Sequence, residues 1–275
     1  MNPSLPNPDS ELRAQALGLL CDDNVSRKVE RTRHLHAQWL AQHIDLDPSA
    51  CLTPEASLPG RPANPVLVPP REVGRRAMTS VEGRAALIHA LAHIEFNAVN
   101  LALDAVWRFS DMPREFYGDW LKVAAEEALH FSLLEAHLRT LGYAYGDFNA
   151  HNSLWEMAQK TADDVTARMA LVPRTLEARG LDATPAVRAK LAQVGDDAAA
   201  AILDIILRDE VGHVAIGNHW YRWLCERDGS DPVALYAALS LRYKAPPLRG
   251  PFNLDARRAA GFSDEEIAVL EAAGL

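Results

Sequence analysis

Two copies of one pattern, a glutamate and a histidine three positions apart, constrain this chain more than any other feature. The copies are Glu127-Ala128-Leu129-His130 and Glu210-Val211-Gly212-His213. On an α-helix, residues three positions apart lie on the same side. A further glutamate precedes each copy: Glu95 lies 32 residues before Glu127, and Glu177 lies 33 residues before Glu210. Such a duplicated set is the ligand pattern of a helix bundle that binds two metal ions.

The helical neighbours of these acids are apolar, which places the acids on core faces. Three groups of neighbours show this: Ile88, Leu91, Ala92, Ala98, Val99 and Ala102 around Glu95; Trp120, Val123, Ala124, Phe131 and Leu134 around Glu127; Leu203, Ile206, Leu207, Val214 and Gly217 around Glu210. An unpaired carboxylate in a core costs several kcal/mol or stays protonated. Two divalent cations would balance four carboxylates, with two imidazoles completing the coordination. The alternative is a metal-free bundle whose glutamates are buried by chance or lie at packing edges.

The composition favours a helical protein without a nucleic-acid partner. Alanine and leucine dominate the 275 residues, and 37 acidic against 28 basic residues give a net charge of -9 with no concentrated basic tract. The three cysteines are far apart and lack Cys-x-x-Cys spacing, which fits reduced thiols in a cytoplasm. No apolar run approaches the roughly 18 residues of a membrane span, and residues 1–10 lack a secretory pattern. We therefore expect a cytoplasmic protein with no membrane segment.

Helix and proline signals divide one expected domain, 1–275, into three regions. Residues 1–78 hold an amphipathic helix over about 23–43 and a strap, residues 48–70, with seven prolines. The strap's apolar residues Val66, Leu67 and Val68 are expected to pack onto the protein. Residues 79–228 form the metal-binding bundle, and residues 229–275 form a covering segment with a terminal helix over 263–273. The expected fold class is all-α, a four-helix bundle with additional N- and C-terminal helices and proline-rich covering segments.

The first two bundle helices form an expected antiparallel hairpin. A capping box at residues 79–82 starts the first helix, which runs to about residue 109. The second runs from residue 113 to about residue 140, where Gly142 supplies a stop. Since Glu95 and Glu127 are about equally far from the turn, they should lie at the same height.

The third and fourth helices form a second expected hairpin. Residues 153–156 form an expected capping box, in which the Glu156 side chain caps the N-terminus of the third helix. Because Glu156 then has a structural role, Glu177 is favoured as the metal ligand from this helix. The run Gly180–Pro185 predicts an interruption of this helix. If Glu177 and Glu210 lie at the same height in the bundle, the turn between their helices must fall midway between them, at 194–197. The fourth helix then runs over about 197–225.

The repeated Glu and Glu-x-x-His pattern resembles the ferritin-like di-iron carboxylate superfamily. Four segments resemble one bacterial family within it: Leu91–Glu95, Ala125–Phe131, Leu171–Asp182 and Arg208–His213. The sequence is most similar to the bacterial ferritin-like domain-of-unknown-function family 455, over nearly the whole chain and including Gly250–Asn253. It is more distantly similar to di-iron tRNA hydroxylases. The resemblance implies a ferritin-like bundle and the following ligand roles: Glu127 and Glu210 bridge two metals, Glu95 and Glu177 are terminal carboxylates, and His130 and His213 each bind one metal.

An acid directly precedes each bridging glutamate: Glu126 and Asp209. Metal-bound imidazoles usually donate their other N–H to a carboxylate, so we expect Asp209 to accept from His130 and Glu126 to accept from His213. His89 and His93 point away from Glu95 on a helix, and we expect packing or solvent contacts for them.

The expected ligands leave coordination positions open for O2, water or substrate. Carboxylate-rich ligation suits iron, with manganese or a mixed Fe/Mn pair as alternatives. We therefore predict an O2-dependent oxidase or hydroxylase of an unidentified organic molecule, with a small-molecule substrate and an external reductant as partners. The alternative is a non-catalytic iron-binding or oxygen-scavenging protein. The prolines should cover faces that a ferritin cage needs, so a monomer or small homo-oligomer is expected.

Overall fold

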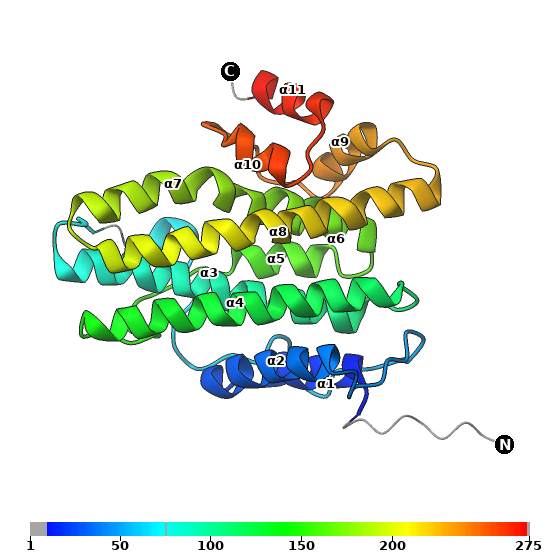
Figure 1. The fold of residues 1–275 in the computed structure, drawn as a ribbon, viewed down its shortest axis with the longest axis horizontal. Coiled ribbons are helices and arrows are strands. Elements are labelled where there is room, and N and C mark those ends of the chain that lie inside the picture. Colours follow the sequence, from blue (N-terminus) through cyan, green and yellow to red (C-terminus); the bar gives the residue numbers. More distant parts are fainter. Residues whose placement is uncertain (1–9, 75, 274–275) are drawn as a thin grey trace. The chain divides into compact units, whose positions relative to one another are not determined.

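The computed structural model describes residues 10–74 and 76–273, and the regular elements in those ranges are all helices (Figure 1). The chain divides into two compact units, unit 1 up to Asn152 and unit 2 from Ser153. The all-α class is confirmed. Each unit contains one antiparallel pair of helices of the kind from which ferritin-like bundles are built. The single domain expected over 1–275 stays a prediction.

Unit 1 is organised around a long helical hairpin. Its elements are α1 (Leu12–Cys21), α2 (Val25–Leu40), the 3-10 turn η1 (Pro70–Glu72), α3 (Val81–Arg108) and α4 (Arg114–Thr140). Helices α3 and α4 pack along each other, α1 packs on α3, and α2 packs on α4 (Figure 1). The predicted hairpin and the predicted amphipathic helix are confirmed, while α1 was not predicted.

The ends of the hairpin helices follow local signals in the sequence. Ser80 caps α3, since its Oγ accepts from the Gly83 N–H at 3.0 Å. Glu82 instead pairs with Arg76 at 2.9 Å, so the reciprocal half of the predicted capping box is wrong. After α4, Gly142 has φ +84°, a left-handed conformation that glycine adopts at little cost and that ends the helix as predicted.

The strap is held by its main chain rather than by its apolar side chains. Val66 is 52% exposed and Leu67 is 38% exposed, so the prediction that they pack onto the protein is wrong. The backbone around them pairs with Ala150: Val68 N–H donates to the Ala150 carbonyl at 2.8 Å, and Ala150 N–H donates to the Val66 carbonyl at 3.0 Å. Because main-chain pairing is independent of residue type, the strap's apolar residues gave no indication of it.

Two buried cations also bind the strap's carbonyl groups. Arg13 is 2% exposed, and its Nη1 donates to the strap carbonyls of Pro48 and Ala50, both at 2.9 Å, and to the carbonyl of Asp47 just before the strap at 3.2 Å. Lys28 is completely buried, and its Nζ donates to the Gly60 carbonyl at 2.9 Å. Prolines leave many strap carbonyls without helix or sheet partners, and these side chains supply the donors.

Unit 2 contains the second hairpin and a C-terminal cover. Its elements are α5 (Ser153–Lys160), α6 (Val165–Leu171), the π-helical turn η2 (Val172–Glu177), α7 (Ala178–Gln193), α8 (Asp197–Asp228), α9 (Pro232–Arg242), α10 (Leu254–Ala259) and α11 (Asp264–Ala273). Helices α7 and α8 pack along each other (Figure 1). Gly195, at φ +80°, and Asp196, which caps α8, form the turn at its predicted place.

The predicted interruption at Gly180–Pro185 is wrong, because α7 continues through Pro185. A proline cannot donate to the carbonyl four residues earlier, which here belongs to Leu181. Asn253 donates to this carbonyl from its side-chain Nδ2 at 3.2 Å. The irregularity of the helix lies earlier, in η2, where Gly217 of α8 allows a close approach: a Cβ added at Gly217 would lie 2.6 Å from Pro173 Cβ.

Replacing Asn253 with alanine is expected to destabilise the protein by about 2 kcal/mol, because a buried acceptor loses its donor and α10 loses its cap. Urea unfolding measures the change. In a Pro185→Ala background the loss should be smaller, since the alanine introduced there has an N–H that can donate to the Leu181 carbonyl. Equal losses in the two backgrounds would contradict this account.

The C-terminal cover packs against α7 and α8 of unit 2. Its core consists of Ala178, Leu181, Val214, Ala260, Phe262, Ile267 and Leu270. The predicted capping box of the last helix is confirmed in both directions: Glu266 N–H donates to Ser263 Oγ at 3.3 Å, and Ser263 N–H donates to Glu266 Oε2 at 2.8 Å.

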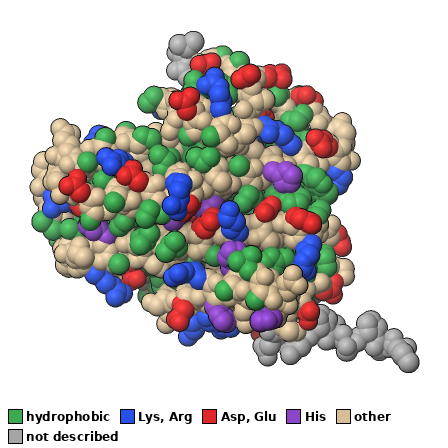
Figure 2. All heavy atoms as spheres, viewed as in Figure 1, with side chains coloured by type: hydrophobic (Ala, Val, Ile, Leu, Met, Phe, Trp, Pro, Cys, Tyr) green, Lys and Arg blue, Asp and Glu red, His purple; other side chains and the backbone are tan. Residues whose placement is uncertain are grey.

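One helix among the described residues, α3, is long and apolar enough to cross a membrane. Of its most apolar window, 72% is buried inside the protein, as in the core helix of a soluble protein. Figure 2 shows charged side chains of both signs over the visible face, with hydrophobic side chains in small groups between them. The burial of α3 accounts for its composition without a membrane.

Candidate metal centre

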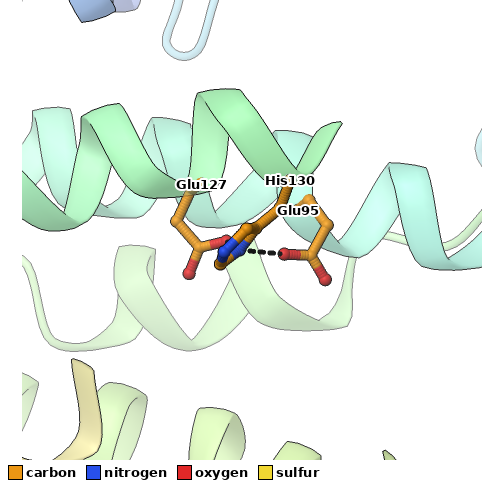
Figure 3. A group of neighbouring side chains, drawn as sticks. All are labelled: Glu95, Glu127 and His130. Atoms are coloured by element: carbon orange, nitrogen blue, oxygen red, sulfur yellow. Dashed lines mark hydrogen bonds and ion pairs between the residues drawn. The ribbon is translucent and has the colours of Figure 1, made fainter. Parts of the chain in front are cut away.

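Glu95 of α3 meets Glu127 and His130 of α4 inside unit 1 (Figure 3). The three residues are at most 4% exposed. His130 Nδ1 lies 3.2 Å from Glu95 Oε2 and 3.3 Å from Glu127 Oε2. The equal heights predicted for Glu95 and Glu127 are therefore confirmed by a nitrogen that contacts both carboxylates. One donor atom from each residue lies within 4.8 Å of the others, which is close enough for one metal ion.

The charges of this group explain why a cation would stabilise it. Burial raises the pKa of Glu95, and the neighbouring Glu127 carboxylate raises it further. Burial alone would lower the pKa of His130, but its hydrogen bonds to Glu127 and Glu95 outweigh burial and raise it. Without metal, the cluster therefore keeps protons that lower the repulsion between its carboxylates. A metal ion held by these residues would replace those protons and balance the same negative charge.

Metal-free protein is expected to lose stability as the pH rises from about 6 to about 8.5. The folded pKa values of Glu95 and His130 are both raised, so the folded state holds protons that the unfolded chain releases near 4.5 and 6.5. That stability is present below these values and is lost as the pH rises toward the folded pKa values. Metal-loaded protein should show the opposite trend, because metal binding releases protons.

Urea unfolding midpoints in EDTA and in saturating Mn²⁺ measure the two pH trends. The Glu95→Gln variant is the control, because its amide cannot titrate and its metal-free stability should depend less on pH. The account would be contradicted if metal-free wild type gained stability over this pH range and if the Glu95→Gln variant showed the same dependence of stability on pH as wild type.

The second Glu-x-x-His pair lies on α8 in unit 2. Glu210 is 8% exposed and His213 is fully buried. His213 Nδ1 lies 3.8 Å from Glu210 Oε2, so the ring presents the same nitrogen to its carboxylate as His130 does. Each unit thus carries one buried pair in which Nδ1 is directed toward a glutamate three residues earlier.

The two candidate glutamates of the predicted third helix lie in different environments. Glu177 is half-buried at the end of η2, which packs on α8, and its Oε2 atom is buried. Glu156 is exposed on α5, which agrees with the preference for Glu177. Within the described part of unit 2, Glu177 does not join Glu210 and His213 in a group whose donor atoms lie within 4.8 Å of one another. Its role as a ligand stays a prediction.

The two acids that precede the expected bridging glutamates contact basic neighbours on their own helices. Glu126 lies 3.8 Å from Lys122 Nζ, and Asp209 accepts from Arg208 Nε at 2.8 Å. The expected hydrogen bonds to His213 and His130 would join residues of different units, and they stay predictions.

His89 and His93 make packing contacts, as predicted. His93 Nδ1 lies 2.8 Å from the Tyr145 hydroxyl, and its Nε2 lies 3.1 Å from the His151 carbonyl. His89 Nε2 accepts from the Gly146 N–H at 2.9 Å. Burial lowers the pKa of each ring to about 4, so both are neutral at physiological pH. These residues hold the loop after α4 against α3.

Comparison with known proteins identifies the family but no activity. Residues 21–268 match the family described as "Protein of unknown function (DUF455)". An uncharacterized protein of Haemophilus influenzae (strain ATCC 51907 / DSM 11121 / KW20 / Rd) is 52% identical over 253 residues, which cover 89% of this chain and 88% of that protein. No solved structure matches. The chain therefore belongs to the ferritin-like-related DUF455 family, as its resemblance predicted.

Proposed function

We propose that this protein binds two iron ions and is an O2-dependent oxidase or hydroxylase of a small organic molecule. The observation that supports this best is the buried group of Glu95, Glu127 and His130, whose donor atoms converge inside a core. The repeated pair Glu210 and His213 supplies equivalent donors. Together with Glu177 these residues form the proposed set of six ligands. Manganese or a mixed Fe/Mn pair would fit the same donors.

The donor chemistry favours iron or manganese over a structural zinc ion. Four carboxylates and two imidazoles are mostly hard oxygen donors, and structural zinc sites are usually closed tetrahedra of thiolates and imidazoles. Bound iron would supply the capacity to transfer electrons to O2. In unit 1, burial of Glu95, Glu127 and His130 excludes bulk water from the donors, which protects a redox reaction from side reactions.

The chain's own residues have distinct roles in this proposal. Glu95 and Glu127 supply negative charge and release protons when metal binds, while His130 Nδ1 supplies a nitrogen donor. The proposed roles of Asp209 and Glu126 are to fix the rings of His130 and His213 through their other nitrogens. A small-molecule substrate and an external reductant complete the reaction. We propose a cytoplasmic monomer or small homo-oligomer with no nucleic-acid partner.

Anaerobic loading with ferrous iron followed by exposure to O2 tests the proposal. We expect about two iron ions per chain, ferric absorption after O2 is admitted, and repeated O2 consumption when a chemical reductant is supplied. One round of oxidation without repeated consumption would favour the non-catalytic iron-binding alternative. Metal-free protein after loading, or a ferrous centre that does not react with O2, would refute an O2-dependent activity.

A further inference from the structure

A cavity of about 280 Å³ lies in unit 1 between the strap, α3 and the loop after α4. It is near the lower limit of size for small-molecule sites. The strap contributes Arg61 and Pro65, α3 contributes Phe96 and Asn97, and the loop contributes Tyr145. None of these residues is among the proposed metal ligands.

Arg61 is the unusual residue of this cavity. Its Nη2 atom is buried and has no hydrogen-bond partner. Within residues 10–74 and 76–273, no acid forms an ion pair with it, and no acid lines the cavity. Burial lowers the pKa of this guanidinium, which is the expected consequence of removing a charge from water without a counter-charge.

The other polar groups of the cavity are already engaged. The Tyr145 hydroxyl and Asn97 Nδ2 both contact the ring of His93, at 2.8 and 2.9 Å. Asn100 Oδ1 accepts from Lys28 Nζ at 2.6 Å, and burial lowers the pKa of that lysine to about 7, so it carries a charge in only part of the molecules at neutral pH. Among the described lining residues, Arg61 is therefore the one that carries a permanent positive charge together with an unused donor.

The remaining walls determine the kind of anion that fits. Phe96 and Tyr145 present aromatic rings 5.7 Å apart, and Pro65 is buried beside them. One guanidinium matches the charge and planar geometry of one carboxylate. A phosphate dianion carries one more negative charge than Arg61 balances, whereas an apolar body suits the rings and the proline.

We propose that this cavity binds a small organic carboxylate, with the carboxylate paired to Arg61 and the apolar body packed against Phe96, Tyr145 and Pro65. Binding supplies the counter-charge that the protein lacks at Arg61 and fills the space beside the two rings. The site is independent of the proposed metal chemistry, because none of its contacts involves Glu95, Glu127 or His130.

Benzoate is the probe for this site, and isothermal titration calorimetry of the full chain measures its binding. We expect saturable binding to wild type that weakens roughly tenfold or more in Arg61→Met, because a charge-assisted hydrogen bond is lost while the apolar stem is kept. The matched control is Arg71→Met, at a strap-adjacent arginine whose side chain is 86% exposed, and it should bind benzoate as wild type does. Benzyl alcohol, which is uncharged, should bind wild type and Arg61→Met equally weakly.

Thermal unfolding separates ligand binding from a structural role of Arg61. Without benzoate, Arg61→Met should unfold at the same or a higher temperature than wild type, since no protein partner is lost. The metal content of Arg61→Met should equal that of wild type. A failure of the carboxylate site can therefore be distinguished from a failure of the proposed metal centre. The proposal is overturned if wild type shows no saturable benzoate binding, or if Arg61→Met binds benzoate as tightly as wild type does. It is also overturned if Arg61→Met unfolds at a lower temperature than Arg71→Met, or if wild type binds inorganic phosphate more tightly than benzoate.

Discussion

Replacing Glu127 with alanine is expected to lower the affinity for iron by at least roughly 100-fold, since loss of an outer hydrogen-bond partner alone costs roughly 10- to 100-fold. Glu127 is fully buried, and its carboxylate and that of Glu95 both contact His130 Nδ1. Without it, the proposed site would lose a buried carboxylate donor and one of the negative charges that balance the ion. Iron per chain after equilibrium dialysis against ferrous iron measures the effect.

Glu135→Ala is the matched control, because Glu135 lies on the same helix, is partly exposed and pairs with Arg139 at 2.8 Å. It should retain the iron content of wild type. A second comparison tests the proposed role of Glu177: Glu177→Ala should lose iron, while Glu156→Ala should not. Retention of wild-type iron content by Glu127→Ala would refute the metal centre.

Replacing Arg257 with alanine is expected to destabilise the protein by about 3–5 kcal/mol, because it removes one partner of a buried ion pair. Arg257 is 1% exposed, and its Nε and Nη2 donate to the two carboxylate oxygens of Asp182 at 3.0 and 2.6 Å. Its guanidinium also lies over the rings of Phe252 and Phe262, 5.2 Å from each centroid. Urea unfolding followed by circular dichroism measures the loss.

The neighbouring Arg258 provides the control for this prediction. Its side chain is 49% exposed, and its acidic neighbours Asp255 and Asp264 are fully exposed at 4.0 and 3.8 Å. Arg258→Ala should therefore unfold at the same urea concentration as wild type within error. Arg257→Met combined with Asp182→Leu should recover much of the loss, since no buried charge then lacks a partner. Equal stabilities of Arg257→Ala and Arg258→Ala would contradict the prediction.

The sequence by itself determined the helical hairpins and most of the candidate ligands. Glutamate and histidine three positions apart must share a helix face, and equal distances from a turn must put two residues at one height. The requirement of equal distances from a turn located the turn before α8 at Gly195 and Asp196, although the stronger local signal at Gly180–Pro185 favoured an earlier break. Geometry of this kind depends on helix rise and period alone, so it can be read without knowledge of tertiary contacts.

Tertiary structure decided the features that depend on a distant partner. Pro185 stays within α7 where Asn253, far along the chain, donates to the carbonyl that the proline leaves free. Arg13 and Lys28 are basic residues that a sequence assigns to the surface, yet both are buried because the strap's carbonyls need donors. The unpaired charge at Arg61 likewise follows from which residues surround it. Local sequence fixes backbone propensity and side-chain period, whereas the satisfaction of buried polar groups is a property of the folded chain.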